Sequence, residues 1–362
     1  MIDIFNNFYR GKRVLVTGHT GFKGSWLSIW LHELGAEVVG VAQAPFTERD
    51  NYVLSGIGRK IKADIRADIR DGERMKEIFR QYQPEIVFHL AAQPLVRLSY
   101  DIPVETYQTN VMGTINILEA IRSTDSVKVS VMITTDKCYE NKEQIWGYRE
   151  NEPMGGYDPY SSSKGAAEIA INSWRRSFFH PDDYGTKHHA SIASVRAGNV
   201  IGGGDWALDR IIPDCIKALE AGKPIEVRSP KAVRPWQHVL EPLGGYMLLA
   251  QKMWNDPTQY CEGWNFGPGA ESITPVWEVA SKVVENYGSG ELKDLSDLNA
   301  LHEATLLMLD ISKARFRLGW EPRMDIRRCI ALTVDWYKCY GDMDVYELCV
   351  EEIKKYLSDE NK

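Results

Sequence analysis

Short apolar runs that end in glycine or polar residues alternate with longer amphipathic segments over the first half of the chain. Runs rich in β-branched residues have the pattern of buried parallel strands, at 13–17, 37–42, 61–65, 85–90 and 130–135. Apolar residues at helical spacing predict intervening helices at 22–34, 71–82 and 104–122. This alternation predicts an α/β fold built on a doubly wound parallel sheet of the Rossmann type.

The regularity falls away after about Arg196, where glycine, proline and tryptophan become frequent. We therefore expect a dinucleotide-binding domain at 1–195 and a smaller, mixed α/β substrate domain at 196–362. A helical pattern within 240–255 could return to the first domain. The segment 345–357 predicts a final amphipathic helix.

Composition narrows the classes of protein. The net charge of −7 argues against a nucleic-acid or anionic-membrane surface as the main partner. The six cysteines form no CxxC pair and no zinc-like spacing with histidine, so reduced thiols and no metal site are expected. The chain has no apolar stretch of the ~18 residues that a membrane span needs. Its first residues also lack the pattern of a signal peptide, so a cytoplasmic enzyme is expected.

The first predicted strand runs into a glycine-rich loop that opens a helix. Its residues are Gly18, His19, Thr20, Gly21, Phe22, Lys23 and Gly24. Glycines at this spacing let the backbone approach a phosphate, and the helix start offers free N–H groups to a pyrophosphate. The spacing differs from GxGxxG, and His19 and Lys23 are expected to add polar or positive bulk beside the phosphates.

The end of the second strand bears on cofactor choice. Val41-Ala42 stands where an acid for the adenosine ribose is usual. This leaves the preference between NAD and NADP open at this point, and Arg49 could contact either a 2′-hydroxyl or a 2′-phosphate.

A tyrosine and a lysine four residues apart open a predicted helix after Asp158-Pro159. Tyr160 and Lys164 would project from one face of that helix. A phenol with a pKa near 10 can act as a base at neutral pH only beside positive charge, which Lys164 and an oxidised nicotinamide would supply. A partner hydroxyl is expected from Thr135, at the end of the fifth strand.

These motifs together resemble the extended short-chain dehydrogenase/reductases over essentially the whole chain. The loop resembles TGxxGFxG, and Thr135, Tyr160 and Lys164 match the Ser/Thr-Tyr-Lys triad. The resemblance implies an NAD cofactor, with further contacts from Asp68 and Ile69 at the adenine and from Leu90, Ala91 and Ala92 behind the cofactor. His89, in the same HxAA-like stretch, is expected to be a buried, hydrogen-bonded side chain and not a catalyst.

The residues after Thr135 separate water-removing members of this family from the others. Sugar-nucleotide 4,6-dehydratases usually carry Thr-Asp-Glu here, and this chain has Asp136 and Lys137. The segment 135–141 resembles the CDP-glucose 4,6-dehydratases. Elimination of water needs an acid and a base. Asp136 is the expected acid, with a pKa raised by burial and lowered by Lys137, whereas Lys137 is either the base or a stabiliser of the enolate.

The same resemblance assigns the substrate end of the site. Asn199 lies in a stretch similar to RxxNVYG, Arg210 in one similar to R-x-I-P, and Arg234 in R-x-W-x-x-V. Arg234 is suited to a bidentate grip on a diphosphate. The stretch from Asn265 to Pro268 resembles the NxG stretch that lies near the nucleotide in this family. The segment 196–362 is accordingly expected to bind a sugar nucleotide.

The resemblance implies NAD-dependent dehydration of CDP-D-glucose to CDP-4-keto-6-deoxy-D-glucose, for deoxysugars of surface polysaccharide such as O-antigen. Two alternatives stay open: an epimerase of the same fold, which Asp136-Lys137 disfavours, and a non-catalytic cofactor sensor, which the triad disfavours. The choice of cytosine rests on resemblance alone. Helices near 104–122 and 160–178 pair between subunits in the family, which implies a homodimer or homotetramer.

Overall fold

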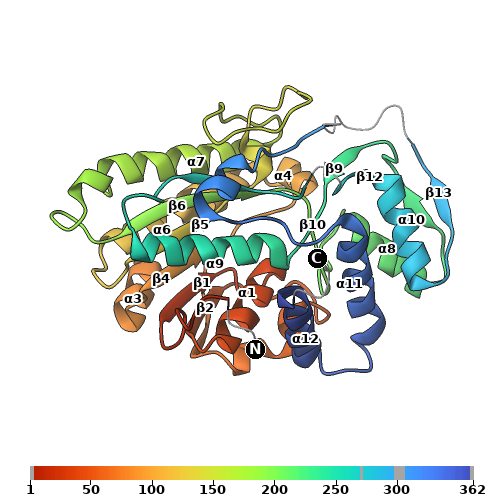
Figure 1. Ribbon diagram of the computed structural model, residues 1–362, viewed down its shortest axis with the longest axis horizontal. Helices are drawn as coiled ribbons and strands as arrows, with labels where there is room; N and C mark the ends of the chain where they lie inside the picture. Colours follow the sequence, from red (N-terminus) through yellow and green to blue (C-terminus); the bar gives the residue numbers. More distant parts are fainter. Residues whose placement is uncertain (1–3, 270–271, 297–305, 359–362) are drawn as a thin grey trace.

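A computed structural model describes residues 4–269, 272–296 and 306–358. Its centre is a seven-stranded parallel sheet in the order β11-β6-β5-β4-β1-β2-β3 (Figure 1). The strands are β1 (Arg13–Thr17), β2 (Glu37–Ala42), β3 (Ala63–Arg66), β4 (Ile86–His89), β5 (Val129–Ile133), β6 (Ser191–Ala197) and β11 (Gly263–Phe266). The predicted doubly wound parallel sheet is confirmed, and β4, β5 and β6 are buried along their whole length, as strands covered on both faces should be.

Helices cover both faces of this sheet. One face carries α1 (Phe22–Glu33) and α9 (Leu240–Asn255), whose side chains join one large apolar cluster. The other carries α3 (Gly72–Tyr82), α6 (Gly113–Arg122) and α7 (Pro159–Ser177), which build a second cluster. The sheet therefore separates two cores, and its carboxyl edge is free for a ligand site.

The helix expected at 104–122 is interrupted. It consists of α5 (Pro103–Tyr107), a π-helical turn at Gln108–Met112, and α6. The wide turn accommodates Asn110, a buried residue whose amide nitrogen donates to the Ser163 hydroxyl at 2.9 Å and to the Gln93 carbonyl at 3.1 Å. The spacing of apolar residues in the sequence does not reveal such a turn, because the contacts that hold Asn110 come from α7 and from the loop after β4.

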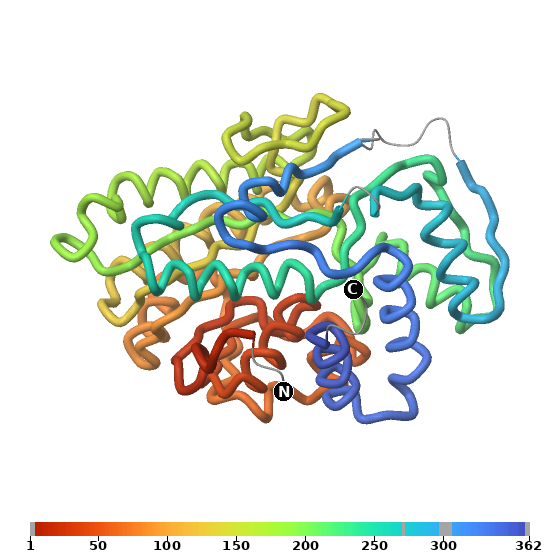
Figure 2. Tube along the Cα trace, in the orientation of Figure 1, coloured from red at the N-terminus to blue at the C-terminus, as the bar shows by residue number. Residues whose placement is uncertain are grey.

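The chain after β6 contributes to both halves of the molecule. The helix α9 packs against β5 and β6, and β11 pairs with β6 as the last strand of the central sheet. The terminal helix α12 (Val345–Leu357), predicted at these residues, packs on α1 and on α2 (Asn51–Ser55). Figure 2 shows the dark blue tube of α12 beside the red tube of α1.

The remaining elements form a smaller mixed unit beside the carboxyl edge of the sheet (Figure 1). Three two-stranded pairs, β7 with β10, β8 with β13 and β9 with β12, lie among its helices. The bounds are β7 (Val200–Ile201), α8 (Ile211–Glu220), β8 (Ile225–Val227), β9 (Val233–Pro235), β10 (Gln237–His238), β12 (Ile273–Pro275), α10 (Val276–Tyr287), β13 (Leu292–Asp294) and α11 (Ile326–Cys339). The short helix α4 (Val96–Asp101) belongs to the other half, where it packs on α5 and α7. The division of the chain at residue 195 stays a prediction.

No helix in the described part of the chain combines the length and the apolar character that crossing a membrane requires.

Candidate active site

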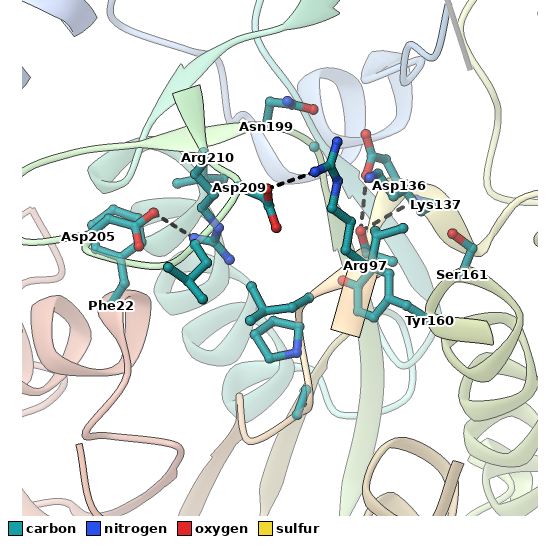
Figure 3. A pocket seen from close by; sticks show the side chains of 18 of the residues that line it. Phe22, Arg97, Asp136, Lys137, Tyr160, Ser161, Asn199, Asp205, Asp209 and Arg210 are labelled. Atoms are coloured by element: carbon teal, nitrogen blue, oxygen red, sulfur yellow. Dashed lines mark hydrogen bonds and ion pairs between the residues drawn. The ribbon is translucent and has the colours of Figure 1, made fainter. Parts of the chain in front are cut away.

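A cavity of about 1280 Å³ opens at the carboxyl edge of the sheet, between the two halves of the molecule (Figure 3). Parallel sheets bind ligands at this edge because loops from neighbouring strands converge there. The cavity wall includes nearly all the predicted site residues: Gly18, Thr20, Gly21, Phe22, Lys23, Gly24, Asp68, Leu90, Ala91, Ala92, Thr135, Asp136, Lys137, Tyr160, Lys164, Asn199, Arg210 and Arg234.

The glycine loop is shaped by close backbone contacts. Gly18 has φ +75°, and a Cβ there would lie 2.7 Å from the Ala91 nitrogen. A Cβ on Gly24 would lie 2.1 Å from the Gly18 carbonyl oxygen. Both positions therefore exclude side chains, and the start of α1 faces the cavity as a phosphate-binding helix terminus requires.

The side chains of His19 and Ile69 lie outside the cavity wall, and the predicted contact of these two residues with a cofactor stays a prediction. His19 is fully buried beneath the loop, where its Nε2 lies 2.7 Å from the Asp64 carboxylate and its ring occupies the space left by Gly40. Ile69 packs in the core against Gly113. Of His19 and Lys23, which were expected beside the phosphates, Lys23 lines the cavity.

The adenosine end of the cavity is lined by Asp68 and Gln43. The Gln43 amide donates to Asp68 at 2.8 Å, and Arg70 also donates to this carboxylate. Arg49 does not serve this end, contrary to the sequence interpretation. Its guanidinium pairs with Glu220 at 2.7 Å and stacks over the Trp206 ring.

Tyr160 and Lys164 project into the cavity from the first turns of α7. The side chain of Asp158 caps this helix by accepting from the Ser161 backbone N–H at 2.9 Å. Burial raises the pKa of Tyr160 to about 12, and a hydrogen bond with Thr135 opposes that rise. Burial lowers the pKa of Lys164 to about 8, against the charge of Glu168. Ionisation of Tyr160 near neutral pH therefore needs further positive charge in the cavity.

Asp136 and Lys137 form a short 3-10 turn directly after β5, which Thr135 caps. Burial raises the pKa of Asp136, and the charge of Lys137 is the largest influence lowering it, as expected from the sequence. Lys23 reaches this group from α1: burial lowers the pKa of Lys23 to about 8, and Asp136 opposes that fall. A carboxyl with a raised pKa is suited to donate a proton.

A buried ion pair behind the site was not predicted from the sequence. The Glu168 carboxylate accepts from Arg196 Nε and Nη2, both at 2.9 Å, and from the Thr134 and Ser194 hydroxyls. Glu168 lies four residues after Lys164, on the same face of the helix as Tyr160 and Lys164. This spacing is the feature of the sequence from which its position near the site could have been predicted. The pair joins α7 to the ends of β5 and β6, which carry the other catalytic candidates.

His89 lies next to the cavity-lining residues Leu90, Ala91 and Ala92 in the chain but does not itself line the cavity. Its ring nitrogens contact the Thr17 hydroxyl at 2.8 Å and the Thr114 hydroxyl at 3.1 Å. Burial lowers the pKa of His89 to about 3, so the ring is neutral at physiological pH. The expectation of a buried, hydrogen-bonded histidine is confirmed.

The substrate end of the cavity is rich in arginine. Arg210 pairs with Asp205 at 2.6 Å, and buried Arg234 lies on β9. The Asp209 carboxylate forms an ion pair with Arg97 at 3.2 Å (Figure 3). It also accepts from Arg228 at 3.1 Å, and the two arginines belong to the two halves of the molecule. The cluster provides cationic groups for an anionic ligand.

Asn265 does not line the cavity, although its motif resembles a nucleotide-side stretch. It is fully buried, donating to the Tyr148 carbonyl at 2.8 Å and accepting from the Tyr139 hydroxyl at 2.8 Å. The side chain therefore ties β11 to the segment that follows the catalytic turn. Within the described ranges, no group of His, Cys, Asp or Glu side chains is arranged to hold a metal ion.

The sequence pattern of the GDP-mannose 4,6 dehydratase family matches residues 15–333. The chain belongs to this family. Its predicted membership of the extended short-chain dehydrogenase/reductases is thereby confirmed.

A relative in sequence agrees with the family assignment, and solved structures of lower identity agree with the fold. The chain is 49% identical to a CDP-glucose 4,6-dehydratase of Salmonella typhimurium over 359 residues, covering 99% of both chains. A structure of UDP-glucose-4-epimerase from Stenotrophomonas maltophila with bound NAD matches at TM-score 0.77 and 22% identity, covering 91% of this chain and 99% of that one. The dTDP-glucose 4,6-dehydratase DesIV of Streptomyces venezuelae matches at TM-score 0.75 and 22% identity, covering 90% and 97%.

Proposed function

We propose that this protein catalyses the NAD-dependent dehydration of CDP-D-glucose to CDP-4-keto-6-deoxy-D-glucose. The observation that carries the proposal is Asp136-Lys137 at the end of β5, on the cavity wall with Tyr160. An epimerase needs no acid of this kind, whereas water loss does. The similarity to the Salmonella CDP-glucose 4,6-dehydratase supports CDP-glucose as the substrate.

The cavity residues fit a dinucleotide cofactor. Gly18 and Gly24 leave no room for side chains where backbone must approach a pyrophosphate, and Ala91 and Ala92 offer a flat wall beside them. The bound structures of relatives with NAD support NAD as the cofactor. When bound, NAD would take a hydride from C4 of the sugar and return it to C6.

The side chains of the chain itself divide the proton transfers. Tyr160 takes the proton of the C4 hydroxyl, with Lys164 supplying positive charge beside it. The C4 ketone then acidifies the C5 hydrogen. Lys137 takes that proton or stabilises the enolate, and Asp136 protonates the departing C6 hydroxyl. Arg234, Arg210 and Asn199 hold the sugar nucleotide, with the diphosphate on Arg234.

We also infer a homodimer or homotetramer in the cytoplasm. The elements α5, the π turn and α7 expose Val104, Tyr107, Met112 and Ile169, which supports an interface on this face. All six cysteines are free thiols, which supports a reducing compartment. Supply of deoxysugars for lipopolysaccharide is the role that this product fits.

Incubation with CDP-glucose and NAD tests the proposal. The expected result is a 4-keto product that absorbs in alkali, with UDP-, dTDP- and GDP-glucose as competing substrates. Formation of CDP-galactose without water loss would establish the epimerase instead, and no turnover with any nucleotide would favour a cofactor sensor.

Tyr160→Phe provides the matched test of the site. It removes one hydroxyl and is expected to lower turnover ~10²–10⁴-fold, the usual effect of losing a general base, with unchanged circular dichroism. Tyr184→Phe, which alters a phenol outside the cavity wall, is the control and should retain full turnover. Near-normal turnover by Tyr160→Phe would remove this residue from the mechanism.

A further inference from the structure

A chain of hydrogen-bonding groups connects Tyr160 to Asp136. The Thr135 hydroxyl donates to Asp136 Oδ1 at 3.0 Å, and the same hydroxyl is within hydrogen-bonding reach of the Tyr160 phenol. Thr135 carries a single hydroxyl proton, so when it donates to Asp136 its lone pairs can only accept. One accepts from the Lys137 backbone N–H at 3.4 Å, and the other remains able to accept from Tyr160. Thr135 stabilises the phenolate of Tyr160 when it donates to that oxygen, whereas once Tyr160 is protonated the phenol can donate to Thr135 while Thr135 donates to Asp136.

The three groups are screened from bulk water by the protein. Tyr160, Thr135 and Asp136 are 8%, 7% and 3% exposed, respectively. Asp136 Oδ2 has no hydrogen-bond partner among the described residues, whereas Oδ1 is held by Thr135. A half-turn about the Cβ–Cγ bond of Asp136 would thus break only one hydrogen bond and would move a newly protonated oxygen to the position of Oδ2, on the side of Gly198.

The dehydration proposed above leaves Tyr160 and Asp136 with opposite proton imbalances. Oxidation at C4 leaves one proton on Tyr160, and loss of water at C6 takes one proton from Asp136. The hydride leaves C4 and arrives at C6, and the C5 proton is removed and replaced, so these transfers cancel. Each turnover therefore ends with one proton too many at Tyr160 and one too few at Asp136.

The other charged groups near Asp136 come from different elements. Lys137 is its neighbour in the chain, Lys23 reaches it from α1, and Arg234 from β9. Arginine does not release its proton in proteins, and none of the three connects Asp136 to Tyr160. Thr135 is the group that touches both.

We propose that Thr135 is a proton relay, which passes the proton taken by Tyr160 from the C4 hydroxyl to Asp136 for delivery to the departing C6 hydroxyl. The inference rests on the proposed dehydration. It adds to the usual function of a hydroxyl beside a catalytic tyrosine, which is to stabilise the phenolate, because it requires transfer to a second residue and couples the oxidation step to the elimination step.

Two leaving groups distinguish the relay from phenolate stabilisation. CDP-glucose loses hydroxide, which needs a proton, whereas CDP-6-deoxy-6-fluoroglucose loses fluoride, which needs little acid assistance. Thr135→Val removes the hydroxyl with little change of shape, and Thr135→Ser retains it. We expect Thr135→Val to raise the ratio of fluoride loss to water loss at least about tenfold, since general acid assistance is worth ~10²–10⁴. Asp136→Asn should raise the same ratio, and Thr135→Ser should restore it.

An unchanged ratio in Thr135→Val, with both substrates slowed equally, would overturn the relay and leave phenolate stabilisation as the role of Thr135. A pH-indicator dye during one turnover of the wild-type protein gives a second measurement that needs no variant. The relay predicts no net proton release during C4 oxidation. Release into the buffer followed by uptake during water loss would contradict it. If the wild-type protein does not convert CDP-glucose at all, the proposed function fails, and not the relay alone.

Discussion

Glu168 shows how a single buried carboxylate organises the catalytic residues without lining the cavity. Burial on its own would raise its pKa, but the charge and hydrogen bonds of Arg196, with hydroxyl donors from Thr134 and Ser194, lower it to about 2. The carboxylate is therefore ionised in the native state at neutral pH. It holds the strand ends β5 and β6 against the helix that carries Tyr160.

Glu168→Gln should destabilise the protein by about 3–5 kcal/mol, because it leaves the buried Arg196 guanidinium without a counter-charge. Urea unfolding measures the change. Glu77→Gln, which breaks a solvent-exposed pair with Arg74, is the matched control and should change stability little. Equal effects of the two substitutions would show that the buried pair is not specially important.

The same carboxylate predicts a pH dependence of stability. A depressed folded-state pKa contributes stability above the unfolded value and loses it as pH falls. The Glu168 contribution should be complete above about pH 4.5 and decline toward pH 2. The stability difference between the wild-type protein and Glu168→Gln should therefore narrow over this interval.

Some residue positions were predictable and others were not, for physical reasons. The triad and Asp136 follow strand ends or open a helix, and such positions must face the carboxyl edge of a parallel sheet. The directions of His19 and Arg49 depend on Gly40 and Glu220, which are remote in sequence, and no local pattern encodes these contacts.

At the scale of elements, α7 is positioned from its first turn. The Asp158 carboxylate accepts from the backbone N–H and hydroxyl of Ser161, at 2.9 and 2.6 Å, one residue beyond Tyr160. The helix start therefore determines where the catalytic phenol lies. The sequence predicted this helix and its start because Asp158-Pro159 is a strong initiation signal. It did not predict the π turn, whose cause is tertiary.

Asp158→Ala should cost about 0.5–2 kcal/mol of stability, the usual loss of an N-cap, and should also lower kcat. Asp71→Ala removes the corresponding cap of α3, where the carboxylate accepts from Arg74 N at 3.0 Å, away from the cavity wall. This control should lose similar stability with unchanged kcat. Asp158→Ser, which retains a capping oxygen, should recover both properties.

At the scale of the whole molecule, the cavity lies between two halves, one with the predicted cofactor contacts and the other with the predicted substrate contacts. The acids nearest the adenosine end are already engaged: Asp64 by His19, Tyr52 and Arg66, and Asp68 by Arg70 and Gln43. Asp64 lies outside the cavity wall, and in Asp68 only Oδ1, which accepts from the Arg70 backbone N–H alone, has capacity left for a ribose hydroxyl. We therefore expect NAD to be bound reversibly and not retained through purification.

NAD added to extensively dialysed protein should raise its thermal midpoint. Ligand at about 100 times its Kd stabilises the native state by ~2.7 kcal/mol. NADP and adenosine in parallel scans would show whether the 2′-phosphate is rejected and whether the nicotinamide half contributes. Stoichiometric NAD that survives dialysis would contradict the expectation.

The position of β11 has a consequence for biosynthesis. Translation delivers β6 well before β11, its partner at the sheet edge, and before α9, which covers the adjoining face. A nascent chain that has emerged only through β6 exposes an open strand edge and uncovered apolar surface, both of which favour aggregation. The ribosome-bound intermediate should therefore be a chaperone client, and truncation before residue 263 should yield insoluble protein and not an isolated cofactor-binding fragment.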